Sequence, residues 1–180
     1  ADPRRGDEGG RGARTLGEQS DPDIGQRVGD PLQCSDQAVD AAVREILAKA
    51  GRIDLLVNNA GVGLVGAAEE SSLEQAKSVF DVNLFGVIRM TKSVLPLMRQ
   101  QRSGRIVNIS SVMGLIPSPF MALYSASKHA VEGYSQALDH EVRACGIRVV
   151  LVEPGYTRTT FESNALAADQ QSEHYALGRA

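Results

Sequence analysis

The 180-residue chain lacks the features that mark membrane, secreted and nucleic-acid-binding proteins. No apolar run approaches the ~18 residues of a membrane-spanning helix, and no hydrophobic leader follows the charged N-terminus. Nineteen Lys and Arg residues against 22 Asp and Glu residues give a net charge of −3, which offers nucleic acid no attraction. Cys34 and Cys145 are too few and too far apart for a disulfide framework or a zinc site. We therefore expect a cytoplasmic globular protein.

Composition divides the chain into two parts. Residues 1–33 contain seven glycines, three prolines and five arginines, and they have no apolar run suited to a buried strand. We predict an irregular or mobile arm there. Residues 34–180 show regular apolar patterning and are expected to form one domain.

Predicted helices and strands alternate beyond Ser35, a plausible helix N-cap, with Gly51 as the matching stop. The helical stretch at 72–102 is expected to break near Asn83 and to bend at Pro96. In chain order the elements are a helix at 35–50, a strand at 53–57, the helical stretch at 72–102, a strand at 105–109, a helix at 124–145 and a strand at 147–152. Apolar strands alternating with helices predict an α/β fold with a parallel sheet covered on both faces.

Three loops follow the predicted strands, and they span 58–61, 110–111 and 154–159. Ligands of such sheets bind at the carboxyl ends of the strands, so we expect these loops to converge on one site.

Tyr124 and Lys128 are four residues apart near the start of a predicted helix, so their side chains share one face. A free tyrosine has a pKa near ~10, which a neighbouring ammonium lowers by favouring the phenolate. Such a tyrosine can donate and accept a proton at neutral pH. An ordinary surface pair is the alternative interpretation.

Ser111 follows a strand, where its hydroxyl is able to hydrogen-bond a substrate oxygen while Tyr124 moves the proton; the alternative is a turn serine. Asn83 interrupts an apolar helical stretch, and a buried asparagine without partners costs ~1–3 kcal/mol, so it either caps a helix break or has a function. A serine hydrolase is a poor interpretation, because Ser111 lacks a Gly-x-Ser-x-Gly elbow and a partner histidine. The three histidines match no metal motif and are expected at exposed positions; they are His129, His140 and His174.

Taken in order, these motifs resemble the short-chain dehydrogenase/reductase family. They are Asn58-Asn59-Ala60-Gly61, Asn83, Ser111, Tyr124-Ser125-Ala126-Ser127-Lys128 and Pro154-Gly155-Tyr156-Thr157-Arg158-Thr159. The resemblance implies a Rossmann-type, doubly wound parallel sheet in three αβα layers. It also implies an oxidoreductase that transfers hydride between NAD(P)(H) and the carbonyl or alcohol of a small molecule.

The resemblance also implies roles for individual residues. Tyr124 would be the catalytic acid and base, and Lys128 would lower its pKa and hold the nicotinamide ribose. Ser111 would orient the substrate oxygen, and Asn83 would hold a water that links Lys128 to solvent. Further cofactor contacts would come from Asn58, Ala60, Gly61, Pro154, Gly155, Thr157 and Thr159. Arg4 and Arg5 slightly favour NADP over NAD.

The sequence departs from the family pattern at both ends. It has no Thr-Gly-x-x-x-Gly-x-Gly turn, and only 20 residues follow Thr160. We therefore expect an incomplete fold without the first βαβ unit and the last strand. The alternative function is a non-catalytic remnant or interaction module that does not bind dinucleotide. An apolar loop at 112–123 indicates a hydrophobic substrate or core packing, and the two long helices are the expected surface of a homo-oligomer.

Overall fold

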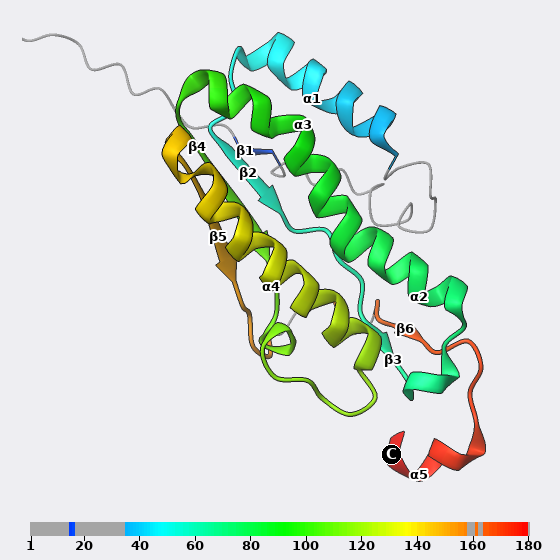
Figure 1. Ribbon diagram of the computed structural model, residues 1–180. Helices are drawn as coiled ribbons and strands as arrows, with labels where there is room; N and C mark the ends of the chain where they lie inside the picture. The colour runs from blue at the N-terminus through cyan, green and yellow to red at the C-terminus, as the bar shows by residue number, and fades with distance from the viewer. Residues whose placement is uncertain (1–14, 17–34, 158–160, 162–163, 180) are drawn as a thin grey trace, which may run out of the picture.

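Four parallel strands form the central sheet of the computed structural model, which describes residues 15–16, 35–157, 161 and 164–179 (Figure 1). The strands lie in the spatial order β1-β2-β4-β5. Their bounds are β1 Thr15–Leu16, β2 Leu55–Asn58, β4 Gly104–Ile109 and β5 Ile147–Val152. The last three confirm the predicted strands to within two residues at each end.

Strand β1 lies in the segment predicted to hold no strand, and that prediction is wrong at these two residues. Thr15 pairs with Leu55 and Leu16 with Leu56, in parallel. The segment has no run of Val, Ile and Leu that would reveal a strand from its sequence. The strand forms because it pairs with β2. The rest of residues 1–33 lies outside the described residues, and the arm stays a prediction there.

Capping residues set both ends of the first long helix. Helix α1, Asp36–Ala50, starts at Ser35, whose hydroxyl accepts the Ala38 N–H at 3.3 Å, and ends at Gly51 with φ 74°. The other long elements are α2 Leu73–Phe80, α3 Gly86–Gln101 and α4 Ala122–Val142. Pro96 lies inside α3, which continues beyond it for another turn.

A π-helical turn, Asp81–Phe85, joins α2 to α3 and contains Asn83. The break predicted near Asn83 is therefore confirmed, in the form of a wider helical turn. Such turns place one extra residue in the helix and occur frequently at functional sites.

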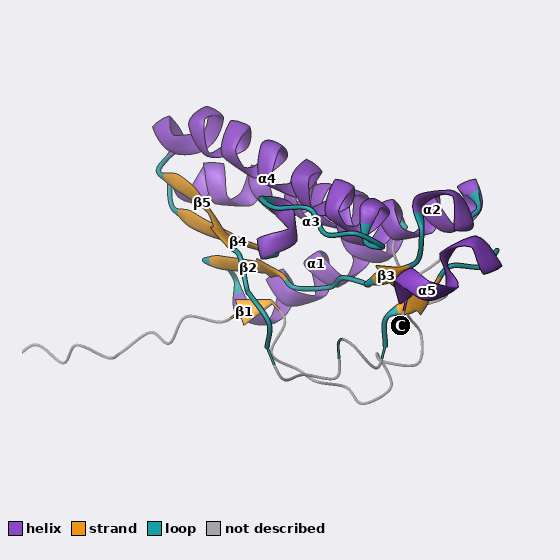
Figure 2. Cartoon of the chain, turned by 90° about the horizontal axis from the view of Figure 1, so that it is seen from below, coloured by secondary structure: helices purple, strands orange, loops and turns teal. Residues whose placement is uncertain are grey.

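Helices α1, α3 and α4 all cover the same face of the sheet (Figure 2). Each strand pairs beyond the previous one in a single direction, so right-handed crossovers put every connecting helix on that face. Their core joins Val43, Val94, Met98, Ile106 and Ile147, all nearly inaccessible to solvent.

Among the described residues no helix covers the opposite face, where Val150 and Val152 are 38% and 41% exposed. The expected second helical layer is thus not among them, although the parallel α/β sheet agrees with the predicted fold class. None of the helices in this part of the chain is long and apolar enough to cross a membrane.

A second, two-stranded sheet lies beyond the carboxyl end of the first. It pairs β3, Leu64–Val65, with β6, Leu166–Ala167, in parallel. A short helix α5, Ala176–Arg179, follows near the C-terminus. Two-residue strands have no periodicity that a sequence could reveal, so these elements were not predicted.

Candidate active site

The three predicted loops converge at the carboxyl edge of the central sheet. The Ser110 N–H donates to the Val152 carbonyl at 2.8 Å, and the Val112 N–H donates to the Pro154 carbonyl at 3.0 Å. Asn58 pairs with Asn108 in the β2–β4 ladder. The expected convergence is therefore confirmed for the described parts of these loops, residues 58–61, 110–111 and 154–157.

Tyr124, Ser111 and Lys128 meet at this edge. Tyr124 is only 5% exposed, and the Ser111 hydroxyl is close enough to its phenol to favour the phenolate. Lys128, also 5% exposed, donates through Nζ to the Ile109 carbonyl at 2.8 Å, and its Nζ lies 5.8 Å from the centroid of the Tyr124 ring. The arrangement places a phenol, a hydroxyl and a buried ammonium around one space.

Burial controls the proton affinities of this group. It raises the pKa of the Tyr124 phenol above its usual value, and the nearby Ser111 hydroxyl opposes that shift. Burial lowers the pKa of Lys128 to about 8, and the Glu132 carboxylate one helical turn further on opposes it. The expectation that Lys128 lowers the pKa of Tyr124 is wrong for the net shift, because loss of hydration around the phenol dominates.

Asn83 ties the π-helical turn to the loop after β2. Its Oδ1 accepts the Val62 N–H at 2.8 Å, and its Nδ2 donates to the Val62 carbonyl at 2.9 Å and to Ser127 Oγ at 3.0 Å. Ser127 Oγ in turn donates to the Tyr124 carbonyl at 2.7 Å. Asn83 thus fixes the neighbouring loop and the helix that carries Tyr124.

A second chain of hydrogen bonds lies behind the site and was missed by the sequence interpretation. Asn58 Nδ2 donates to Asn108 Oδ1, and Asn108 Nδ2 donates to Ser135 Oγ, each at 2.8 Å. The signal was present, because Asn108 is a polar residue inside the apolar strand Arg105 to Ile109. Asn58 therefore uses its amide group inside the sheet, although it was predicted as a cofactor contact.

The remaining predicted cofactor residues divide by exposure. Ala60, Gly155 and Thr157 are exposed, Gly61 and Pro154 are half-buried, and Thr159 lies outside the described residues. A Cβ at Gly61 would lie 3.4 Å from Asn83 Oδ1 and 3.5 Å from Lys128 Nζ. Glycine therefore keeps open a space lined by an amide oxygen and an ammonium, a pair of groups that suits the hydroxyls of a nicotinamide ribose.

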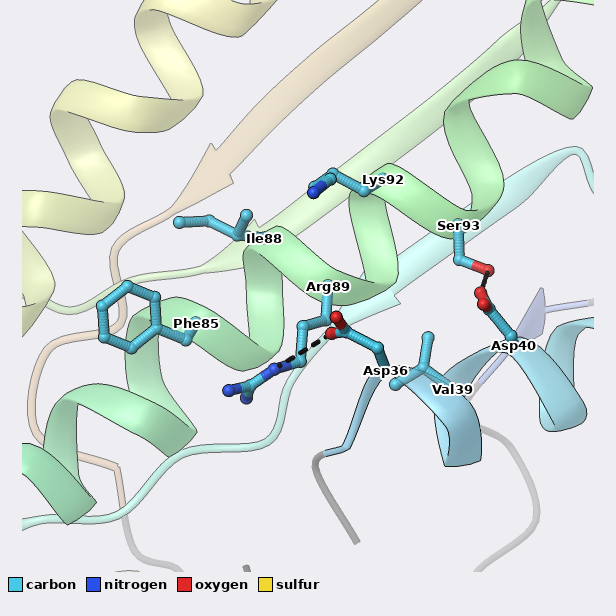
Figure 3. A pocket seen from close by; sticks show the side chains of 8 residues that line it. All are labelled: Asp36, Val39, Asp40, Phe85, Ile88, Arg89, Lys92 and Ser93. Atoms are coloured by element: carbon cyan, nitrogen blue, oxygen red, sulfur yellow. Dashed lines mark hydrogen bonds and ion pairs between the residues drawn. The ribbon is translucent and has the colours of Figure 1, made fainter. Parts of the chain in front are cut away.

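Groups elsewhere in the described chain offer no competing chemistry. His129, His140 and His174 are exposed, as predicted. No cluster of three or more potential metal ligands occurs in the part of the chain that the structure describes. A groove between α1 and α3 lies apart from Tyr124 and is lined by both acidic and basic side chains (Figure 3). There Ser93 donates to Asp40, and Arg89 pairs with Asp36.

Residues 15–170 match the family model described as short chain dehydrogenase. The chain belongs to the short-chain dehydrogenase family. A short-chain dehydrogenase from Streptomyces avermitilis superposes with a TM-score of 0.73 at 39% identity, covering 80% of this chain and 54% of that one. A family member from Burkholderia phymatum in complex with NAD gives a TM-score of 0.70 at 36% identity, covering 73% of this chain and 48% of that one.

Curated members of the family match at higher identity. The chain is 46% identical over 141 residues to 3-ketodihydrosphingosine reductase of Bacteroides thetaiotaomicron, covering 77% of this chain and 52% of the relative. It is 47% identical over 133 residues to retinol dehydrogenase 8 of Bos taurus, covering 74% and 42%. The chain spans about half the length of these curated relatives.

Proposed function

We propose that this chain carries the catalytic group of an oxidoreductase that interconverts a carbonyl and an alcohol with NAD(H) or NADP(H). The observation that carries the proposal is the burial of the Tyr124 phenol, the Ser111 hydroxyl and the Lys128 ammonium together, with Lys128 Nζ 5.8 Å from the centroid of the Tyr124 ring. This group stands at the carboxyl edge of a parallel sheet, where ligands of such folds bind. A bound nicotinamide dinucleotide would supply or remove the hydride.

Each residue of the group has a distinct role in proton transfer. Tyr124 gives its phenolic proton to the substrate oxygen during reduction and takes it back during oxidation. The Ser111 hydroxyl donates a hydrogen bond to the same oxygen and so stabilises its developing charge. The Lys128 ammonium stabilises the phenolate that Tyr124 becomes, and Asn83 holds the backbone around both residues, where it would also hold a water next to Lys128.

A hydrophobic substrate suits the walls of the site. Val112, Leu115 and Ile116 follow Ser111 and are exposed, and Phe161 lies against the Tyr124 ring with centroids 5.8 Å apart. Two relatives are named for 3-ketodihydrosphingosine and for retinol, which are both lipophilic. We therefore expect a lipophilic ketone or alcohol.

The cofactor preference is proposed from weaker signals. Arg4 and Arg5 favour the 2′-phosphate of NADP, and both lie outside the described residues. The Burkholderia phymatum relative was crystallised with NAD, which supports dinucleotide binding in general.

We further propose a homo-oligomer that forms through the exposed faces of α3 and α4. Light scattering after gel filtration tests this oligomeric state.

Titration with NADPH and with NADH, followed by nicotinamide fluorescence, is the first test. Saturable binding, followed by reduction of a long-chain ketone that Tyr124→Phe abolishes, is the expected result. A folded chain that binds neither dinucleotide would instead be a non-catalytic member of the family.

A further inference from the structure

Residues 164–179, here called the C-terminal strap, are held against the loop that follows β2. The Leu166 N–H donates to the Gly63 carbonyl at 2.9 Å, and the Ala168 N–H donates to the Val65 carbonyl at 3.0 Å. Ala168 is buried, and a Cβ at Gly66 would lie 2.3 Å from the Ala168 Cβ, so the two segments are in close contact. The strap is therefore attached along its length.

Glu70 receives hydrogen bonds from both segments at the centre of this attachment. Its Oε2 accepts the Ala67 N–H at 2.8 Å, and its Oε1 accepts the Ser172 N–H at 2.6 Å. Its main-chain carbonyl accepts the Gln170 N–H at 2.8 Å. Glu70 is 1% exposed, so water does not readily replace its carboxylate as the acceptor for the Ala67 and Ser172 N–H groups.

Asp169 makes the reciprocal contact from the strap to the body. Its Oδ1 accepts the Ser72 N–H at 2.8 Å, and the Gln75 side chain donates to the Ala167 carbonyl at 2.8 Å. Asp169 is exposed, and water competes for such bonds at the surface, so each of them stabilises less than one made by a buried carboxylate. Glu70 is therefore the stronger attachment of the two.

The attachment reaches the catalytic tyrosine through Gly63. A Cβ at Gly63 would lie 3.2 Å from both the Ala165 Cβ and the Phe161 ring, so the strap and Phe161 pack on the same glycine. The Phe161 ring lies against Tyr124, with centroids 5.8 Å apart. At the far end of the strap, Tyr175 packs edge-on against Phe120, with centroids 6.4 Å apart. Anything that loosens the strap removes support from the apolar wall beside Tyr124.

We infer that Glu70 is a positioning residue for the substrate side of the site: by holding the C-terminal strap it keeps Phe161 against Tyr124. This inference rests on the proposed function, because it assigns Phe161 to the wall that an apolar substrate contacts. The hydrogen bonds of Glu70 described above hold the strap, so we expect Glu70 to act on substrate affinity and not on proton transfer.

Hydrogen exchange tests the attachment without any need for activity. In Glu70→Gln only one oxygen is left for the Ala67 and Ser172 N–H groups, and the new NH2 group faces the donor that has lost its acceptor. Glu69→Gln is the control, because its remaining oxygen still accepts the exposed Tyr175 hydroxyl. We expect the Gln170 and Ser172 amides to exchange about tenfold faster in Glu70→Gln and at the wild-type rate in Glu69→Gln. Unchanged exchange in both variants would overturn the inference.

Kinetics then test the consequence for substrate. With a long-chain ketone, KM in Glu70→Gln is expected to rise about tenfold while kcat stays within about twofold of wild type. A fall in kcat with an unchanged KM would contradict the assignment. A wild type without turnover would overturn the proposed function and the assignment of Phe161 to a substrate wall, and the exchange data would still decide whether Glu70 holds the strap.

A second variant, Asp169→Ala, tests the attachment of the strap even if Glu70→Gln does not fold. Asp169→Ala changes only an exposed residue of the strap, and circular dichroism should show a wild-type helix content. Exchange in residues 166–172 should be faster than in wild type, by less than in Glu70→Gln. Wild-type exchange throughout the strap of a folded Asp169→Ala protein would count against an attachment made by these carboxylates.

Discussion

Asn83 and Lys128 each hydrogen-bond another part of the chain, and Ser111 is buried, whereas Gly155 and Thr157, which follow β5 at the same sheet edge, are exposed. Apart from Gly155 and its two chain neighbours, no described residue has a heavy atom within 4 Å of the position a Gly155 Cβ would take. The first side, which we call the proton-transfer side, is ordered by the chain itself. The second, the β5 side, presents exposed residues to the solvent. Substitutions should therefore affect the two sides in different ways.

Tyr124→Phe should have the largest effect, because it removes the proton donor and keeps the ring that packs on Phe161. Turnover is expected to fall about a thousandfold or more, while the melting temperature changes little. Tyr134→Phe, nearer the C-terminal end of α4, is the matched control and should retain activity. Comparable activity in both variants would remove Tyr124 from the proton-transfer side.

Asn83→Ala should have the largest effect on stability. It removes three hydrogen bonds, two of them to the Val62 backbone, and leaves buried polar groups without partners. We expect urea unfolding to show a loss of about 3 kcal/mol. Asn59→Ala changes an exposed asparagine nearby and should stay within about 0.5 kcal/mol of wild type. Equal losses of unfolding free energy in the two variants would mean that the hydrogen bonds of Asn83 stabilise the fold no more than an exposed asparagine does.

Glu132→Gln should shift the pH dependence of the reaction. The pKa of Lys128 is about 8, and the Glu132 carboxylate raises it, so the ammonium form is lost as the pH rises through about 8. Without the carboxylate that loss begins at lower pH, and kcat/KM should fall earlier on the alkaline side. Glu141→Gln removes the same charge from an exposed position of α4 and should leave the profile in place.

Thr157→Val should have the smallest effect on the protein itself. Because Thr157 is exposed, the free energy of unfolding is expected to change by less than about 0.5 kcal/mol. Dinucleotide affinity should nevertheless fall, by about tenfold if one hydrogen bond to the ligand is lost. A variant that loses stability and keeps its affinity would reverse the contrast between the two sides.

The sequence predicted what depends on local patterns. Ser35 and Gly51 cap α1 as expected, and the apolar runs 105–109 and 147–152 form the expected strands. The carboxyl ends of parallel strands meet at one edge, which is why the sequence could predict that the loops after the strands lie together. The proton-transfer chemistry proposed for this edge depends on Tyr124 and Lys128 sharing a helix face.

The features that the sequence did not reveal depend on distant partners. Glu70 stands in an acidic run that suggests a solvated surface, yet its carboxylate accepts an N–H from Ser172 about a hundred residues later. The raised pKa of Tyr124 depends on how deeply the phenol is buried, which the spacing to Lys128 does not encode. The two-residue strands β3 and β6 exist only because they pair with each other.

The π-helical turn has a consequence for insertions and deletions in this chain. The wide turn absorbs its extra residue, which in an ordinary α-helix would rotate α3 relative to α2 by about 100°. Gln75 of α2 thereby reaches the strap while Val94 and Met98 of α3 face the sheet. Deleting Leu84 should therefore convert the wide turn into ordinary α-helix and leave α2 and α3 facing their present partners, so a cooperative urea unfolding transition should remain. A deletion inside α3 has no wide turn to absorb it and should cost much more stability.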